Sequence, residues 1–248
     1  MREPGLIERP SPNHGARRGE GGIDMLVLHY TGMASAAAAL DRLCDPASQV
    51  SAHYLIDGGG ATYALVPEAR RAWHAGVGFW AGERDINSRS LGIELHNPGH
   101  GPNYHAFPAE QMRALIVLVR GILARHVIPP ERVLGHSDVA PRRKRDPGEL
   151  FDWRVLADAG IGLWPGQPVA ALPTGLGPGS GGREVRELQV ALRRFGYEVA
   201  DNGRFDSATE AAVAALQRHF RPAAVSGIAD GETRALLAAL LDRLRPSA

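Results

Sequence analysis

The sequence predicts an α/β fold, in which a mixed sheet is flanked by helices and a small three-helix domain follows it. Two observations carry this prediction. Between residues 23 and 163, short apolar runs of strand length alternate with segments whose apolar residues recur at helical spacing. Residues 164–182 are rich in proline and glycine, and three further amphipathic helical patterns lie beyond them.

Five short segments carry the pattern of β-strands, and they are residues 25–30, 51–56, 62–66, 90–95 and 132–135. The first, MLVLHY, is largely apolar, which is typical of a strand buried within a sheet. The second and third flank the sequence DGGG at 57–60, and this glycine-rich turn predicts a β-hairpin.

Three segments of the same region are predicted to be helices, and they are residues 34–43, 108–127 and 149–159. The clearest is 108–127, where Pro108 stands at the start and apolar residues from Met112 to Leu123 recur at helical spacing.

The chain divides into four parts. Residues 1–22 are polar and contain prolines, so we predict a flexible N-terminal arm. Residues 23–163 form the main domain, and residues 164–182 form a linker. Residues 183–244 form the three-helix domain, which is near the lower size limit at which a hydrophobic core alone suffices.

Composition narrows the classes of function. The formal net charge of +1 gives no reason to expect nucleic acid or an anionic membrane as a partner. The single cysteine, Cys44, excludes an internal disulfide. No run approaches the roughly 18 apolar residues of a membrane span, so we predict a cytoplasmic protein without membrane insertion. A misassigned start codon would instead hide a leader and place the protein in the cell envelope or periplasm. The oligomeric state is not determined by the sequence.

Two histidines and an aspartate are candidate metal ligands. His29 closes the apolar run 25–30, while His136 and Asp146 lie in the segment 135–148 (GHSDVAPRRKRDPG), which is too rich in proline and glycine to be one helix. Two imidazoles and one carboxylate are the ligand set of a catalytic zinc site that keeps its fourth position open for water. A lone histidine is more often structural, so the prediction depends on the three residues together. Asp138, which is nearer to His136, is the alternative carboxylate.

Two further charged residues are candidates for catalysis. Glu94 stands between apolar neighbours on a predicted inner strand, and a buried carboxylate is costly unless it pairs with a cation or takes part in chemistry. Lys144 lies two residues before Asp146 and therefore close to the predicted metal. The alternative for Lys144 is a solvated side chain in the basic run 142–145.

The segment 135–148 resembles the second metal-ligand segment of the zinc-dependent N-acetylmuramoyl-L-alanine amidases of the amidase type 2 family, and the resemblance extends over about residues 23–160. It implies that His29, His136 and Asp146 bind Zn²⁺. It also implies that Glu94 is the general base, which takes a proton from the zinc-bound water and passes it to the departing amine. Lys144 would stabilise the oxyanion beside the metal. The implied fold is that of the amidase type 2 and peptidoglycan recognition proteins.

The same resemblance suggests four substrate contacts, for each of which a structural role is the alternative. Tyr54 would line the cleft from the strand 51–56. Trp73 would form a wall and His74 would lie near the scissile amide. Asn97 would hydrogen-bond to the peptide or the muramoyl group. Five other histidines match no motif and are expected to be surface or core residues, and these are His96, His100, His105, His126 and His219.

The C-terminal segment resembles the peptidoglycan-binding domain that is appended to many wall hydrolases. The resemblance is carried by LQVAL at 188–192 and by GRFDSATEAAVAALQ at 203–217. It implies peptidoglycan or muropeptides as the partner.

The implied reaction is hydrolysis of the amide between the lactyl group of N-acetylmuramoyl, or anhydro-muramoyl, and L-alanine, in wall recycling or remodelling. A cytoplasmic location favours recycled anhydromuropeptides as the substrate, whereas the appended domain favours the intact wall. Two alternatives remain at this point, namely a non-catalytic peptidoglycan-binding or sensing protein and a zinc endopeptidase that acts on stem peptides.

Overall fold

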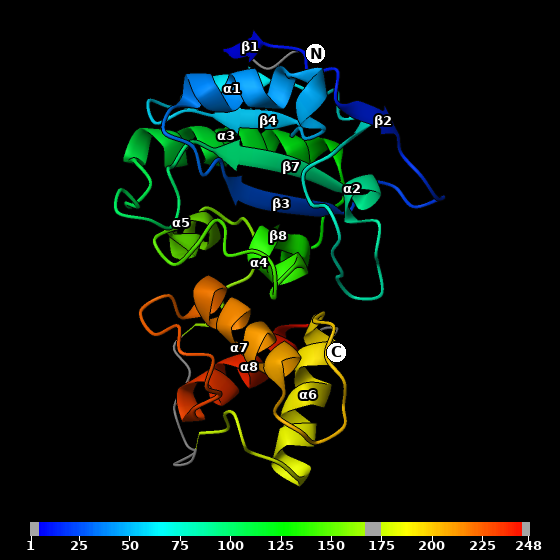
Figure 1. Ribbon diagram of the computed structural model, residues 1–248, viewed down its shortest axis with the longest axis vertical. Helices are drawn as coiled ribbons and strands as arrows, with labels where there is room; N and C mark the ends of the chain where they lie inside the picture. The colour runs from blue at the N-terminus through cyan, green and yellow to red at the C-terminus, as the bar shows by residue number, and fades with distance from the viewer. Residues whose placement is uncertain (1–4, 167–174, 245–248) are drawn as a thin grey trace.

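The computed structural model describes residues 5–166 and 175–244, and it shows a helix-flanked sheet with a helical domain packed beneath it (Figure 1). The six-stranded sheet has the order β1 (Leu6–Glu8), β5 (Thr62–Ala64), β4 (Tyr54–Ile56), β7 (Ser90–Leu95), β3 (Met25–Tyr30) and β8 (Val133–Gly135). The hairpin strands β4 and β5 are antiparallel and the other neighbours are parallel, so the predicted mixed sheet is confirmed.

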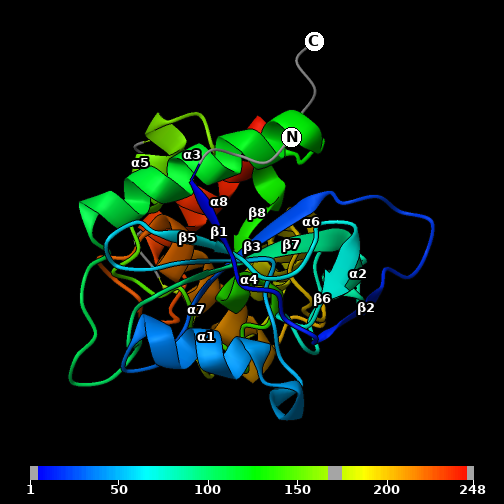
Figure 2. The same ribbon diagram turned by 90° about the horizontal axis from the view of Figure 1, so that it is seen from above.

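The centre of the sheet is the pair β3 and β7, whose bounds coincide with the predicted strands 25–30 and 90–95. Both faces of β3 are covered, by helix α3 (Ala109–Arg125) on one side and by Trp80 and the segment of helix α4 (His136–Val139) on the other. Strand β3 is therefore buried along almost its whole length, which explains its continuous apolar run. Helix α3 covers one face of the sheet and helix α1 (Ala36–Cys44) lies on the other, as the view from above shows (Figure 2).

The remaining elements of this domain are short. They are the strands β2 (His14–Ala16) and β6 (Arg70–Ala72), the helices α2 (Ile86–Arg89), α4 (His136–Val139) and α5 (Trp153–Asp158), and the 3₁₀ turns η1 (Pro46–Ser48) and η2 (Pro130–Arg132). Helix α5 is shorter than the predicted helix 149–159, because the side chain of Asp152 accepts hydrogen bonds from the N–H groups of Arg154 and Val155 and so caps the helix there.

The prediction of a flexible arm is wrong for residues 5–22, while residues 1–4 lie outside the described part of the chain. Strand β1 extends the sheet beside β5, and β2 pairs with β6. The buried amide of Asn13 donates hydrogen bonds to the carbonyl oxygens of Asp45 and Val50, at 2.8 and 2.9 Å. Polar side chains rather than an apolar run hold this segment, so its hydrophobic pattern gave no sign of a strand.

The C-terminal domain contains the three predicted helices, which are α6 (Arg183–Phe195), α7 (Ser207–Phe220) and α8 (Gly231–Arg243). A buried glutamine holds each of the two turns between them. Gln189 accepts from the N–H of Gly203 and donates to Thr209, and Gln217 makes the same pair of bonds to Gly227 and Thr233. The turns at Gly203 and Gly227 are therefore fixed by side chains of the preceding helices.

Part of the predicted linker 164–182 belongs to the folded domains, while residues 167–174 lie outside the described part. Leu176 forms a β-bridge with Ala229, and Gly181 forms one with Arg204. The end of the proline- and glycine-rich stretch therefore packs onto the helical domain.

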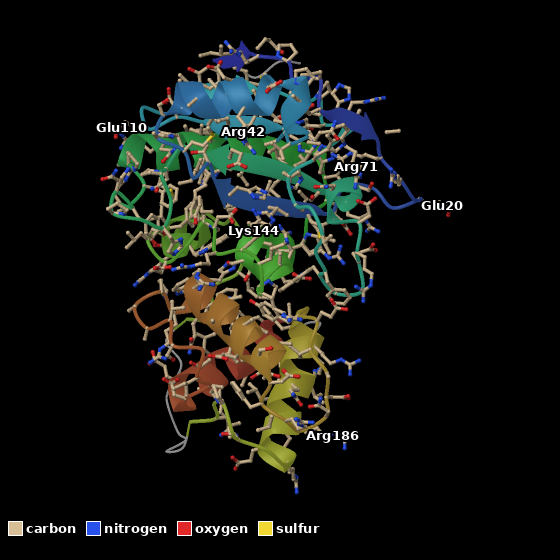
Figure 3. All side chains as sticks on the ribbon, viewed as in Figure 1. Glu20, Arg42, Arg71, Glu110, Lys144 and Arg186 are labelled. Atoms are coloured by element: carbon tan, nitrogen blue, oxygen red, sulfur yellow. The ribbon has the colours of Figure 1, made fainter. Side chains whose placement is uncertain are left out.

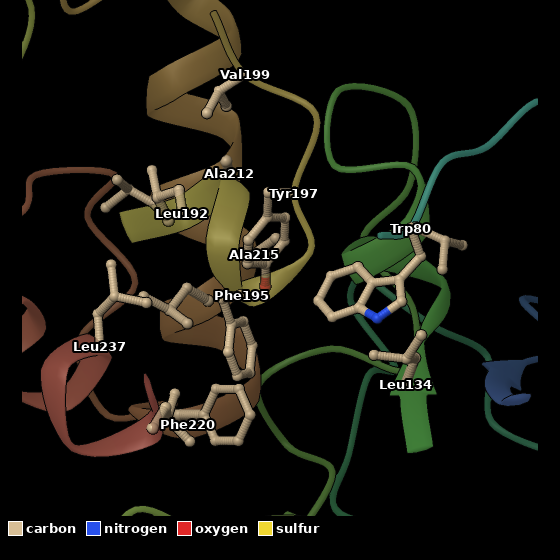
Figure 4. Close-up of a cluster of buried hydrophobic side chains, with 14 of the residues drawn as sticks. Trp80, Leu134, Leu192, Phe195, Tyr197, Val199, Ala212, Ala215, Phe220 and Leu237 are labelled. Atoms are coloured by element: carbon tan, nitrogen blue, oxygen red, sulfur yellow. The ribbon is translucent and has the colours of Figure 1, made fainter. Parts of the chain in front are cut away.

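The two domains share one apolar cluster (Figure 4). Trp80 of the first domain is buried against Phe195 and Tyr197 of the second, with ring centroids 5.7 and 5.0 Å apart. The indole fills the place where a side chain on Gly196 would stand, since a Cβ there would lie 2.5 Å from the ring. Within the described residues, no helix is both long enough and apolar enough to cross a bilayer.

Candidate metal centre

The three predicted metal ligands meet at one edge of the sheet. His29 is the fifth residue of β3, and it pairs with Glu94 of β7. Strand β8 lies on the other side of β3 and ends at Gly135, after which His136 begins α4. Because these three strands are parallel, their carboxyl ends meet at the same edge, which is where open α/β sheets place their ligands.

The donor atoms converge closely. The Nδ1 atoms of His29 and His136 are 2.9 Å apart, and they lie 3.1 and 3.0 Å from Oδ2 of Asp146. All three side chains are buried. A tetrahedral zinc ion with bonds of about 2.0–2.1 Å would hold its donors roughly 3.3 Å apart, which is close to these separations.

The hydrogen bonds of His136 leave a lone pair facing this centre. Its Nε2 lies 2.9 Å from the carbonyl oxygen of Ala75, and because a carbonyl only accepts, Nε2 carries the proton. In the neutral imidazole, Nδ1 is then an unprotonated nitrogen that points toward the carboxylate of Asp146.

A chain of hydrogen bonds gives His29 the same tautomer. The hydroxyl of Ser90 donates to the carbonyl of Ile86 at 2.6 Å, so its oxygen accepts from Nε2 of His74 at 3.2 Å. Nδ1 of His74 is then the acceptor for Nε2–H of His29, at 3.0 Å. The Nδ1 atom of His29 is consequently left as a second lone pair at the centre.

Burial and charge favour the same protonation states. Burial, reinforced by the neighbouring His136, lowers the pKa of His29 to about 4. Burial alone would raise the pKa of Asp146, but the two imidazoles outweigh it and hold that pKa well below its usual value. Two nitrogen lone pairs and a carboxylate oxygen therefore face one another, and a divalent cation such as Zn²⁺ fits this donor set.

The segment 73–76 contacts both predicted histidine ligands. His74 hydrogen-bonds to His29, and the carbonyl of Ala75 accepts from His136. The side-chain oxygen of Asn87 accepts from the N–H groups of His74 and Ala75, at 3.2 and 2.8 Å. Arg143 donates to the carbonyl of Ala75 at 2.7 Å, beside the hydrogen bond from His136. Asn87 was not predicted from the sequence, and Arg143 was noted only as part of the basic run 142–145. Neither lies in a motif that signals contact with the segment 73–76.

The resemblance predicted that His74 lies near the scissile amide, but its contacts indicate a different role. Its side chain borders the cavity, but both ring nitrogens are engaged, one with His29 and the other with Ser90. The geometry assigns it to the orientation of His29. His53 is fully buried, and its Nδ1 accepts from the N–H of Gly92 at 3.0 Å, so its role is structural.

The ligands lie in a cavity of about 430 Å³, whose walls include Trp73, Glu94 and Lys144. The Oε2 atom of Glu94 is buried and has no hydrogen-bond partner among the described residues. Burial, reinforced by the charge of Asp146, raises the pKa of Glu94 well above its ordinary value. The structure thus places both predicted catalytic residues on the wall of the cavity that contains the metal ligands.

Cationic side chains outnumber carboxylates along the cavity. Arg42 comes from α1, while Arg143, Lys144 and Arg145 come from the segment after α4. Figure 3 labels Arg42 and Lys144. A cavity with such walls favours ligands that carry carboxylates.

Two predicted substrate contacts are wrong. Tyr54 is buried on the opposite face of the sheet, because its neighbour Leu55 is the residue in register with Glu94 and side chains alternate along a strand. Its hydroxyl donates to Glu68 at 2.8 Å. Asn97 is fully buried and orders the loop after β7, donating to the carbonyl of His105 and accepting from the N–H of Gly99.

Comparison with known proteins identifies relatives of both domains. Residues 19–149 match the family described as N-acetylmuramoyl-L-alanine amidase, and residues 181–237 match a peptidoglycan binding domain. The chain is 40% identical over 213 residues to the N-acetylmuramoyl-L-alanine amidase AmiD of Escherichia coli K12, an alignment that covers 81% of this chain and 75% of AmiD.

Two solved structures have the same fold over nearly the whole chain. One is the complex of AmiD from E. coli with the substrate anhydro-N-acetylmuramic acid-L-Ala-D-gamma-Glu-L-Lys, with a TM-score of 0.77, 37% identity and 90% of each chain covered. The other is AmpDh3 from Pseudomonas aeruginosa in complex with anhydromuramic pentapeptide, with a TM-score of 0.74, 31% identity and coverage of 90% of this chain and 93% of AmpDh3. On these matches, this chain belongs to the N-acetylmuramoyl-L-alanine amidase family.

Proposed function

We propose that this protein is a zinc-dependent amidase that cleaves the bond between the lactyl carbonyl of an N-acetylmuramoyl or anhydro-muramoyl group and the nitrogen of L-alanine. The observation that carries the proposal is the convergence of two imidazole lone pairs and the Asp146 carboxylate in a cavity that Glu94 and Lys144 also line. The anhydromuramic peptides bound to AmiD and AmpDh3 support soluble muropeptides as the substrate class.

His29, His136 and Asp146 would hold the zinc ion, and the cavity side would remain open to substrate and water. When bound, Zn²⁺ supplies a Lewis acid that polarises the scissile carbonyl and lowers the pKa of a water molecule. Every other part of the chemistry falls to side chains of the chain itself.

Glu94 would act as the proton carrier. Its unpartnered carboxylate oxygen and raised pKa suit a group that accepts a proton near neutral pH and then gives it up. It would take the proton from the attacking water as the new carbon–oxygen bond forms. It would then deliver that proton to the alanine nitrogen as the carbon–nitrogen bond breaks, so that a carboxylic acid and a free amine are released.

Lys144 would stabilise the negative charge that develops on the carbonyl oxygen. Lys144 lines the same cavity as Glu94, and its charge opposes the rise in the pKa of Glu94 that burial and Asp146 cause. One positioned hydrogen-bond donor at a developing oxyanion typically stabilises the transition state by about 2.7–4 kcal/mol.

Two features bear on where the substrate comes from. The peptidoglycan-binding domain supports action on wall material, while the anhydro ends of the ligands in AmiD and AmpDh3 support recycling. We favour anhydromuropeptides as the main substrate. The cytoplasmic location stays a prediction, which fractionation of cells that produce the protein would test.

The direct test is mass spectrometry of the products formed from an anhydromuropeptide. Zinc-loaded protein should release the intact stem peptide and the anhydro-sugar, a chelator should stop the release, and added zinc should restore it. A shortened peptide that stays on the sugar would instead indicate an endopeptidase. Binding without cleavage by the zinc-loaded protein would indicate a sensing protein.

A further inference from the structure

A buried carboxylate joins the two domains directly beside the metal centre. Asp138 is only 1% exposed, and three donors surround its carboxylate. The N–H of Gly135 and Nδ1 of His219 each lie 2.8 Å from Oδ2, and the hydroxyl of Tyr197 lies 2.8 Å from Oδ1. Two of these three donors come from the C-terminal domain.

Both donors from the C-terminal domain are rigidly placed. Tyr197 is buried in the shared apolar cluster, and burial beside Asp138 raises the pKa of its hydroxyl, so the O–H keeps its proton. The imidazole of His219 is stacked between the rings of Trp153 and Phe220, with centroids 3.6 and 3.9 Å away. Because a carboxylate only accepts, Nδ1 of His219 carries a proton.

The carboxylate in turn fixes the backbone that carries two metal ligands. The carboxylate of Asp138 accepts a hydrogen bond from the N–H of Gly135. His136 lies between these two residues in the sequence, so the backbone is held on both sides of it. The N–H of Ser137 donates to the carbonyl of Asp146 at 2.9 Å. Gly135 and the single-turn helix α4 together form a short turn, residues 135–139. This turn therefore sets the positions of both His136 and Asp146.

Attachment of the domains does not require this arrangement. Trp80 already packs on Gly196 and Tyr197, the N–H of Ala81 donates to the carbonyl of Gly196, and Arg84 pairs with Glu198. Burial of a carboxylate costs desolvation free energy, which hydrogen bonds must offset. Two of the three hydrogen bonds that do so for Asp138 come from the C-terminal domain.

We propose that the C-terminal domain completes the metal centre, with Tyr197 and His219 as positioning residues that act through Asp138. The domain is then a structural part of the catalytic site as well as a candidate for wall binding. The inference rests on the proposed metal site, and it concerns how firmly this chain holds the turn 135–139.

The first test is Tyr197→Phe in the full-length protein, which removes one hydroxyl and keeps the ring. Residues that hold metal ligands in place through hydrogen bonds typically contribute 10- to 100-fold to metal affinity. We therefore expect Tyr197→Phe to bind Zn²⁺ about tenfold more weakly, as measured by chelator competition. Phe195→Leu is the matched control, because it loosens the same cluster without touching Asp138. It should leave zinc affinity within about twofold of the wild type, well short of that effect.

A second readout needs no metal. In the metal-free protein, amide hydrogen exchange of the peptide covering 135–139 should be faster in Tyr197→Phe than in the wild type or Phe195→Leu. His219→Leu should act like Tyr197→Phe, and His219→Asn, which keeps an N–H donor at the same branch point, should restore part of the protection. This pair decides the matter if Tyr197→Phe does not fold.

Unchanged exchange and unchanged zinc affinity in Tyr197→Phe would overturn the inference, as would equal losses in Phe195→Leu. A wild-type protein that binds no zinc would instead refute the proposed function. The exchange comparison would still show whether the C-terminal domain holds the turn.

Discussion

Nε2 of His29 lies 3.0 Å from Nδ1 of His74, and the opposite nitrogen of His29 faces the metal centre. This hydrogen bond sets the tautomer of His29. Because Nε2 carries the proton of the neutral imidazole, Nδ1 has a free lone pair that can bind a metal ion. The chain through His74 and Ser90 ends on a backbone carbonyl of α2. The tautomer of one metal ligand is thus set by the fold of a helix that contributes no ligand of its own.

Replacement of His74 tests this relationship. His74→Phe fills the same space but offers no acceptor to His29, so we expect zinc affinity to fall about 10- to 100-fold, as for other partners of metal-bound histidines. Chelator competition measures the effect, and His105→Phe, at an exposed histidine, is the control. If His74→Phe kept its zinc affinity and lost only turnover, the residue would contact the substrate instead.

Replacement of Glu94 should separate catalysis from metal binding. Glu94→Gln removes the proton carrier but none of the three donor atoms, so zinc content should be unchanged while kcat falls at least about 100-fold. The melting temperature should hold or rise, because a buried, unpartnered carboxylate oxygen is removed. Glu198→Gln, which carries the same change on an exposed side chain, is the control. A near-normal rate in Glu94→Gln would exclude Glu94 as the base.

Stability should depend on pH through Glu68, which lines a different cavity from the predicted metal ligands. Burial alone would raise its pKa, but hydrogen bonds from three side chains outweigh it and lower the pKa to about 2; the partners are Arg125, His126 and Tyr54. A carboxyl whose pKa is lowered in the folded state stabilises the protein above its unfolded pKa, and this contribution is lost as pH falls toward the folded value.

Glu68→Gln should therefore lower the free energy of unfolding at pH 7 by roughly 1–2 kcal/mol, and the difference from the wild type should shrink between about pH 4.5 and pH 2. Urea unfolding across this range measures it. Glu187→Gln, which breaks only a surface ion pair with Arg183, is the control. A difference that does not change between pH 7 and pH 2 would show that Glu68 acts by packing alone.

Deletion of the C-terminal domain should impair more than binding to the wall. Sequence organisation predicts that removal of residues from 166 onward spares the cleavage of small muropeptides. The structure predicts otherwise, because Trp80 would be exposed and Asp138 would lose Tyr197 and His219 as partners. We expect lower thermal stability and slower cleavage of soluble anhydromuropeptide. Unchanged turnover on this substrate would show that the catalytic domain is self-sufficient.

Sequence patterns predicted the parts of the molecule that depend on local order. The strands β3 and β7 are buried on both faces, so their apolar runs mark them to the residue. The candidate ligands were found because His136 and Asp146 lie in one segment that resembles a known motif. Tyr54 was misplaced because the alternation along β4 depends on its register with β7, which the sequence does not show.

Contacts between segments that are distant in the sequence could not be predicted from it. The N-terminal arm is held by polar groups such as Asn13, whose partners lie more than 30 residues away. Asn87 hydrogen-bonds to the backbone of Ala75. Asp138 accepts hydrogen bonds from Tyr197 and His219 of the C-terminal domain. No sequence pattern around these residues indicates such contacts. Such residues act through the tertiary fold, so only the folded structure reveals them.

Zinc K-edge X-ray absorption of the zinc-loaded protein would show whether His29, His136 and Asp146 hold a catalytic zinc ion. We expect a four-coordinate ion with two imidazole nitrogens at about 2.0–2.1 Å and oxygen ligands at about 2.0–2.2 Å. Asp146→Asn should change this spectrum. A zinc ion without imidazole ligands, or a spectrum that is the same in Asp146→Asn, would show that these three residues do not bind the ion.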